Sequence, residues 1–294
     1  MNILIILLFL VGFLIMIYPQ ISRIYYRIEA DVQVTEFDRG KKALDEEEID
    51  ERIKLAKAFN ESLNNVVEKD PYSEEEKAQG RAEYARMLEI HEKIGHVQIP
   101  AIDTDIPIYA GTAEEILQIG AGHLEGTSLP VGGNSTHAVI TAHSGLPEAR
   151  LFTDLDRLKI GDKFYIHNIK EILAYQVDQI EVIEPSDFSK LLIAPGHDYV
   201  TLLTCTPPMI NTHRLLVRGH RVPYVPEVEE RIIAENRTSF LYRYLFYASL
   251  VLIVILILTV LRLRSKKRKA EMEYRQLKEK EAVANKEGEE RTDE

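Results

Sequence analysis

The chain has 294 residues, a single cysteine and a formal net charge of −11. One cysteine excludes both an internal disulfide framework and a cysteine-rich zinc site. The acidic balance argues against a general nucleic-acid-binding protein, because such a protein presents a basic face to the phosphates. Apolar runs occupy both ends of the chain and leave roughly 220 residues between them, enough for one β-rich domain.

The N-terminal run, residues 3–18, carries no charge. A run of this length is typical of a signal-peptide core or a short membrane helix. No small-x-small cleavage site follows, since the next residues begin with Pro19 and Gln20. We therefore predict a retained membrane anchor over residues 1–19.

The C-terminal run, residues 244–261, is uncharged and long enough to span a bilayer as a helix. Six cations follow between Arg262 and Lys269, which is typical of a cytoplasmic stop-transfer signal and is not explained by a buried core helix. Two spans would place both termini in the cytoplasm and residues 20–243 outside. Within this scheme residues 226–243 are a juxtamembrane linker and residues 262–294 a charged cytoplasmic tail.

Helical periodicity runs from Phe37 to Lys69, with apolar residues on one stripe and charges elsewhere. The tripeptide Asp70-Pro71-Tyr72 breaks the pattern. A capping-box sequence then predicts a second helix over Ser73–Glu92. We expect residues 20–94 to hold two helices separated by this acidic-proline-aromatic loop.

Beyond residue 95 the pattern changes to short alternating or apolar runs, which are typical of strands. The predicted strands lie near Gly95–Pro100, Ile106–Tyr109, His137–Ala142, Lys163–His167, Glu171–Ile183, Tyr199–Cys205 and Arg214–Val222. Asn168-Ile169-Lys170 fits a hairpin turn between two of them. Many short strands with brief helical interruptions favour a closed barrel or sandwich over a parallel α/β sheet, and we place this domain at residues 95–225.

The only cysteine ends one of these predicted strands. Pro207 and Pro208 cannot continue a strand ladder, so Cys205 should lie at the strand's end, near a loop. A free cysteine is usually a small hydrophobic core residue, so the thiol alone leaves an inert role open.

Two other residues stand at the ends of predicted strands. His143 follows an apolar strand and precedes a loop, where catalytic groups tend to accumulate. Arg214 begins the strand after Cys205, so a hairpin would bring these two residues side by side. An arginine on an apolar strand is costly to bury unless it meets an anion. Together the three residues would supply a nucleophile, a proton carrier and a fixed cation for an oxyanion.

Three segments resemble the sortases, the membrane-anchored cysteine transpeptidases of Gram-positive bacteria. Residues 201–205 read Thr-Leu-Leu-Thr-Cys and match the Thr-Leu-x-Thr-Cys signature of that family. Residues 141–145 resemble its histidine segment, and residues 211–215 resemble its arginine segment.

Other segments resemble the pilin-polymerising class C branch. They include residues 122–130 and 151–155 and the C-terminal apolar run. Asp70-Pro71-Tyr72 matches the tip of the N-terminal lid that class C members carry. The resemblance extends over roughly residues 40–265.

The resemblance implies a mainly β fold: a sortase-like closed β-barrel with short helices, an N-terminal helical and lid region, and transmembrane helices at both ends. It implies cleavage of a Leu-Pro-x-Thr-Gly-like sorting signal after its threonine. Cys205 would be the nucleophile, His143 the general acid and base, and Arg214 the stabiliser of the oxyanion or substrate. Thr204 is a further candidate for substrate binding. Whether the thiol and imidazole rest as a neutral pair or as an ion pair stays open.

The same resemblance implies the partners. The acceptor would be a lysine amine of the next pilin subunit, on the outer face of the cell membrane, and no metal or organic cofactor would be needed. Asp70 would pair with Arg214 while Tyr72 covers Cys205; an ordinary turn between helices is the alternative.

Three other readings stay open. The closest is a housekeeping sortase that attaches surface proteins to the cell wall. Another is a different cysteine enzyme, such as a peptidase or an L,D-transpeptidase-like enzyme, which would give Arg214 no clear task. The third is a non-enzymatic membrane-anchored module in which Cys205 is inert.

Overall fold

The computed structural model describes residues 2–63 and 87–231, together with scattered positions between 233 and 272. The chain divides into two units, residues 1–236 and residues 237–294. In the second unit the described residues are helical. In the parts of the chain that the structure describes, no helix combines the length and the apolar character needed to cross a membrane.

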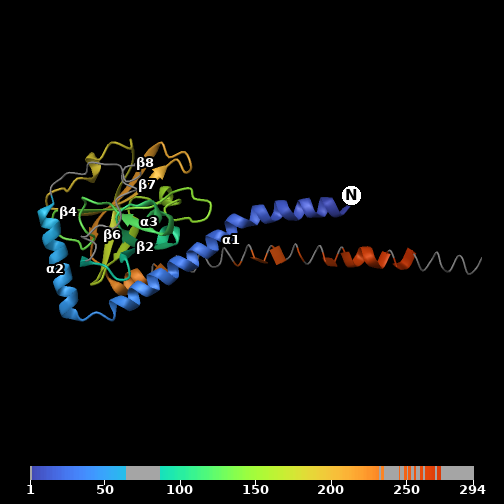
Figure 1. Cartoon of the computed structure of the whole chain (residues 1–294), viewed down its shortest axis with the longest axis horizontal. Coiled ribbons are helices and arrows are strands. Elements are labelled where there is room, and N and C mark those ends of the chain that lie inside the picture. The colour runs from blue at the N-terminus through green and yellow to red at the C-terminus, as the bar shows by residue number, and fades with distance from the viewer. Residues whose placement is uncertain are drawn as a thin grey trace, which may run out of the picture. The chain divides into compact units, whose positions relative to one another are not determined.

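Eight strands of the first unit form a closed barrel (Figure 1). Their order around the barrel is β1-β2-β3-β4-β7-β8-β6-β5. The strands are β1 (Lys93–Ile99), β2 (Thr104–Ala110), β3 (Ala121–His123), β4 (Thr136–Thr141), β5 (Lys163–His167), β6 (Ile172–Ile183), β7 (Asp198–Thr206) and β8 (His213–Val222). The prediction of a mainly β, closed-barrel fold is confirmed.

All seven predicted strands are present, each within two residues of its expected start. The eighth, β3, was not predicted because its three residues Ala-Gly-His carry no β-branched or aromatic signal. The predicted turn at Asn168 is also confirmed: its backbone N–H donates to the Glu171 carbonyl, 3.1 Å, and its side-chain oxygen accepts from the N–H groups of Lys170 and Glu171.

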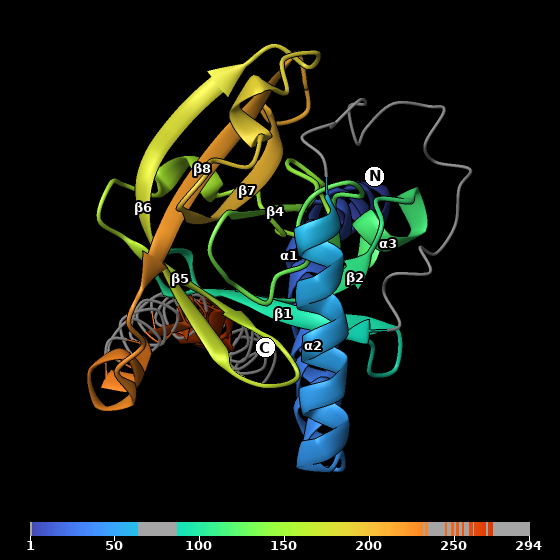
Figure 2. The same ribbon diagram turned by 90° about the vertical axis from the view of Figure 1, so that its left-hand side faces the viewer.

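The strands that carry the site are buried on both faces. β4 pairs in parallel with β7, and β7 pairs antiparallel with β8 (Figure 2). The inner faces of these strands join the main hydrophobic core through residues such as Ile140, Leu202 and Val217. The outer faces of these strands contribute Val139, Leu203 and Leu216 to a second apolar cluster. Leu124, Ile183 and Leu191 complete this cluster. A strand that is covered on both faces is held rigidly, which suits a platform for reactive side chains.

Short helical elements connect the strands. They are η2 (Pro100–Ile102), α3 (Glu114–Ile119), η3 (Leu155–Arg157) and η4 (Ser189–Leu191). α3 joins β2 to β3, and η4 lies in the connection between β6 and β7. Leu191 of η4 belongs to the outer apolar cluster, so this connection covers the outer face of β7 and β8.

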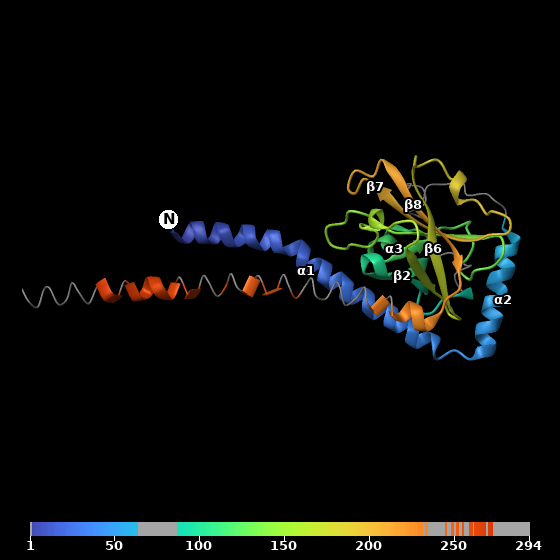
Figure 3. The same ribbon diagram turned by 180° about the vertical axis from the view of Figure 1, so that it is seen from behind.

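Two long helices precede the barrel, α1 (Asn2–Lys41) and α2 (Glu46–Ser62), and α2 runs along one side of the barrel (Figures 2 and 3). The predicted single helix over residues 37–69 is wrong in two places: the chain turns between Lys41 and Glu46, and α2 ends at Ser62, before an extended Leu63. Asp45 causes the new start: its side chain accepts from the Glu48 backbone N–H at 2.7 Å and caps α2. α1 passes Pro19 without interruption.

Residues 64–86 lie outside the described residues. They include Asp70-Pro71-Tyr72 and most of the helix predicted over Ser73–Glu92. The end of that helix is wrong, because Ile90 and Lys93 form a β-bridge, with His91 and Glu92 at positive φ between them.

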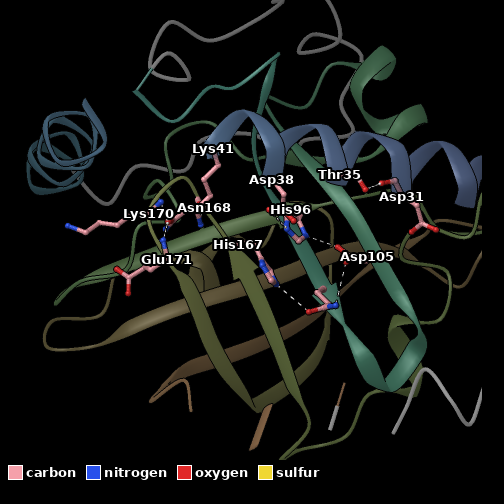
Figure 4. Close-up of polar contacts among 11 residues, drawn as sticks. Asp31, Thr35, Asp38, Lys41, His96, Asp105, His167, Asn168, Lys170 and Glu171 are labelled. Atoms are coloured by element: carbon pink, nitrogen blue, oxygen red, sulfur yellow. Dashed lines mark hydrogen bonds and ion pairs between the residues drawn. The ribbon is translucent and has the colours of Figure 1, made fainter. Parts of the chain in front are cut away.

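His96 ties α1 to the barrel (Figure 4). It lies in β1 and is buried. Its Nδ1 is 2.7 Å from Asp105 Oδ1 of β2, and its Nε2 is 3.6 Å from Asp38 Oδ1 of α1. Its ring stacks on that of His167, with centroids 4.0 Å apart. Burial alone would lower the pKa of His96, but the two carboxylates raise it to about 9, so this histidine is a cation at neutral pH.

The last turn of α2 is anchored by the buried side chain of Asn60. The Asn60 amide donates to the Leu129 carbonyl at 3.0 Å and accepts from the Leu129 N–H at 2.7 Å. This pair of bonds fixes the last turn of α2, which leads directly into residues 64–86.

Candidate active site

Cys205 lies one residue before the end of β7 and is the free thiol of the chain. β7 ends at Thr206, one residue beyond the predicted end and immediately before Pro207. The residue is 6% exposed, so the protein holds the thiol at the edge of the packed barrel.

Arg214 lies directly opposite Cys205 on β8. Paired residues on neighbouring strands project from the same face of a sheet, so the guanidinium and the thiol share the outer face. Arg214 is also buried, and its Nη1 donates to the carbonyls of Asn211 and His213, both at 3.1 Å. These two bonds fix the cation at the start of its strand.

His143 follows β4, the other neighbour of β7. Thr141 pairs with Leu203 in the parallel register, and the Ala142 N–H donates to the Leu203 carbonyl at 3.2 Å. His143 and Cys205 each lie two residues beyond the paired Thr141 and Leu203. The register therefore brings them side by side at one end of the barrel, with Arg214 on the far side of the cysteine.

Thr204 is turned away from this face. Successive side chains alternate along a strand, and the Thr204 hydroxyl donates to the Ala142 carbonyl at 2.7 Å. It thus joins β7 to the residue before His143. The residue is 1% exposed, which makes the bond a structural support beneath the site.

The loop after β4 packs against the loop after β7. Gly145 has a φ of +80°, and a Cβ there would lie 2.7 Å from the Met209 backbone nitrogen. The Phe152 N–H donates to the His143 carbonyl at 3.1 Å and closes the histidine loop on itself. Glycine at position 145 therefore permits both the backbone conformation and the close approach of the two loops.

The His143 ring has a carboxylate partner that sequence reasoning missed. Its Nε2 is 3.2 Å from Glu114 Oε1, at the first residue of α3. The two residues are 29 positions apart and no local pattern connects them. Acidic residues are common in the first turn of a helix, where they interact favourably with the helix dipole. The sequence therefore gives no sign that Glu114 contacts His143.

The structure thus pairs Cys205 with Arg214, and the parallel register sets His143 beside Cys205 at one end of the barrel. Among the described residues, no cluster of three or more His, Cys, Asp or Glu side chains is placed to hold a metal ion. The arrangement offers a thiol, an imidazole and a guanidinium, a set suited to acyl transfer.

The sortase domain model matches residues 97–222, the span of the barrel. Among solved structures, sortase C-1 from Streptococcus pneumoniae is 76% identical, with a TM-score of 0.64, covering 66% of this chain and 99% of that chain. The pilus-related sortase C of Group B Streptococcus is 62% identical, with a TM-score of 0.63, covering 66% of this chain and 98% of that chain. The chain belongs to the sortase family, and these similar structures are class C sortases.

A curated relative, sortase A of Streptococcus agalactiae serotype III (strain NEM316), is 30% identical over 129 residues, which are 43% of this chain and 51% of the relative. The chain spans between 51% and 62% of the length of the curated relatives it matches.

Proposed function

We propose that this protein is a membrane-anchored class C sortase that joins pilin subunits through a Cys205 thioester. The observation that carries the proposal is the register that sets Cys205 between His143 and Arg214 at one end of the barrel. The high identity to class C structures, one of them described as pilus-related, supports the choice of pilins as substrates.

In the first step, with the proton of the Cys205 thiol on His143, Sγ attacks the threonine carbonyl of a Leu-Pro-x-Thr-Gly-like signal. The S–C bond forms, the Thr–Gly amide bond breaks, and His143 gives its proton to the departing glycine amine. Arg214 stabilises the oxyanion that forms transiently on the carbonyl oxygen.

In the second step a pilin lysine amine attacks the thioester. The new isopeptide C–N bond forms, the C–S bond breaks, and His143 takes the proton that the amine loses. The thiolate of Cys205 is regenerated, so the proposed reaction requires no oxidant, metal or organic cofactor.

The test is to incubate the full-length chain, in detergent, with a pilin that carries a sorting signal. We expect a covalent ladder of pilins that disappears with Cys205→Ala and with loss of the acceptor lysine. Transfer only to cell-wall peptide amines would favour the housekeeping alternative, and a ladder that persists in Cys205→Ala would refute the proposal.

The membrane assignment also belongs to this proposal. It rests on the apolar runs at residues 1–19 and 244–261 and on the cations after the second run. It places the barrel on the outer face of the cell membrane and both termini in the cytoplasm. Protease added to intact cells should therefore cleave the barrel region and spare a tag at either terminus; cleavage of the tags would contradict this topology.

We further propose that Asp70, Pro71 and Tyr72 form a lid over the site, with Asp70 paired to Arg214 and Tyr72 over Cys205. Because Cys205 is the only cysteine, a bulky maleimide reports its accessibility without interference. The double variant Asp70→Ala, Tyr72→Ala should be labelled several-fold faster than wild type. A lid that is closed most of the time would protect the wild-type thiol, and removing its two contacts would expose it. Glu61→Ala, which removes an exposed acid from α2, is the control; equal labelling of all three proteins would refute the lid.

A further inference from the structure

Glu114 is a charged residue beside the site to which the proposed reaction gives no task. Its Oε1 is 3.2 Å from His143 Nε2. The histidine side chain is 17% exposed and that of Glu114 is 36% exposed, so the contact lies in the rim of the site rather than in bulk solvent.

The position of the carboxylate is built into the fold. Glu114 opens α3, whose Leu117 is 1% exposed and packs against β3. A Cβ at Gly122 of β3 would lie 3.1 Å from Leu117 Cδ2, which shows how closely helix and strand approach. One turn along α3, the Gln118 amide donates to the same Glu114 oxygen at 3.3 Å. Helix packing and a side-chain bond thus hold the oxygen that faces His143.

The chemistry of the contact specifies the tautomer of the histidine. An ionised carboxylate only accepts hydrogen bonds, so the imidazole must carry a hydrogen on Nε2 to bond with it. In the neutral ring Nδ1 is then the basic nitrogen, and it is the nitrogen that can take up and release a proton.

We propose that Glu114 is a positioning residue that fixes His143 as the Nε2–H tautomer, so that Nδ1 exchanges the proton with the leaving and attacking amines. This inference rests on the proposed transpeptidase function. In acylation the proton moves from Nδ1 to the departing glycine amine, and in transfer it moves from the lysine amine to Nδ1. The hydrogen on Nε2 stays in the bond to Glu114 throughout.

The variants Glu114→Ala and Glu114→Gln test the proposal, with Glu115→Gln as the matched control on the exposed neighbouring position. Glu114→Ala should lower kcat about tenfold, a part of the ~10²–10⁴ that a general acid–base supplies, and leave KM nearly unchanged. Glu114→Gln keeps an oxygen that can accept from Nε2–H and should retain most of the rate. Glu115→Gln should match wild type.

Nitrogen-15 NMR of the histidine rings in the full-length chain supplies the second readout, with His143 assigned by its loss in His143→Gln. We expect the Nε2–H signature in wild type and Glu115→Gln and a mixture of tautomers in Glu114→Ala. Unchanged rate and unchanged tautomer in Glu114→Ala would overturn the proposal. If wild type makes no isopeptide bond, the proposed function fails, while the ring spectra still decide the role of Glu114.

Discussion

At the scale of single residues, the site depends on a cation that is expensive to bury. Arg214 is 7% exposed, and its guanidinium is fixed by two carbonyls beside the only thiol of the chain. A rigid planar fork held in a nearly dry site can stabilise a developing oxyanion without reorganising during the reaction. We therefore propose for Arg214 a catalytic role that a purely structural strand residue would not have.

Arg214→Lys tests that assignment. A lysine keeps the charge but loses the planar fork, so we expect the fold to survive and the rate to fall about 10²–10³-fold, the effect of removing one oxyanion donor. Steady-state cleavage of a sorting-signal peptide measures the rate, and thermal unfolding checks the fold. Arg218→Lys is the control, since Arg218 lies on the same strand and pairs with Asp178. Wild-type turnover by Arg214→Lys would refute the role.

The positions of the three proposed site residues at strand ends could be predicted from the sequence, because each carries a local signal. Cys205 and Arg214 bracket a proline-containing loop between two apolar strands, and His143 follows a third. Glu114 could not be predicted, since its contact with His143 depends on how α3 packs on β3. Thr204 was predicted as a candidate for substrate binding, but its hydroxyl is bonded to the Ala142 carbonyl beneath the site.

At the scale of secondary-structure elements, the parallel pairing of β4 and β7 aligns the histidine with the cysteine. Thr204 supports this alignment beyond the last ladder pair, through its bond to Ala142. Periodicity located these strands well, because they are long, apolar and bounded by turns. It could not reveal which strands pair, since β4 and β7 are separated by β5 and β6 in the chain.

Thr204→Val should expose the importance of this bond. Valine has nearly the same shape but leaves the buried Ala142 carbonyl without that donor, so the free energy of unfolding should fall by about 1–3 kcal/mol. Urea unfolding measures the change. Thr204→Ser, which keeps the hydroxyl, is the control and should lose less. If the two variants are equally stable, the hydroxyl is not the supporting group; a raised KM with unchanged stability would instead favour direct substrate binding.

The N-terminal helices show where local patterns fail. A continuous helical pattern from Phe37 hid the turn between α1 and α2, because the cap at Asp45 resembles any other acidic residue in a charged stretch. Their docking depends on contacts far apart in sequence, such as that of Asn60 with Leu129. Such contacts have no signature in a single sequence.

At the scale of the whole molecule, four buried or partly buried histidines have pKa values shifted in opposite directions, and these shifts predict how stability depends on pH. His96 has its pKa raised from 6.5 to about 9 by the carboxylates that outweigh its burial. Burial lowers the pKa of His123 and His137 to about 4 each. Burial, aided by the charge of His96, lowers that of His167 to about 3.

These shifts act on opposite sides of pH 6.5. Between pH 6.5 and 9 the folded state keeps a proton on His96 that the unfolded state has lost, so stability falls as pH rises. Between pH 6.5 and 4 the unfolded state protonates three histidines that stay neutral in the fold, so stability falls as pH drops. We expect urea unfolding to show greatest stability near pH 6.5.

His96→Gln separates the two effects. It should flatten the alkaline side of the profile, because the group that holds the extra proton is gone. The acid side should persist, since His123 and His137 are unchanged. A wild-type stability that keeps rising from pH 6.5 to 9 would contradict the positive charge assigned to His96.

We propose that Cys205 forms a thioester with the sorting signal. Intact-mass measurement of the full-length chain, mixed with a Leu-Pro-x-Thr-Gly peptide and quenched in acid, tests it most directly. We predict an added mass equal to that of the peptide up to its threonine less one water, because an acyl group replaces the thiol hydrogen. This adduct should be lost on treatment with hydroxylamine and absent from Cys205→Ala. Peptide cleavage by Cys205→Ala at the wild-type rate, or turnover with no hydroxylamine-sensitive adduct on the wild-type protein, would contradict a Cys205 thioester.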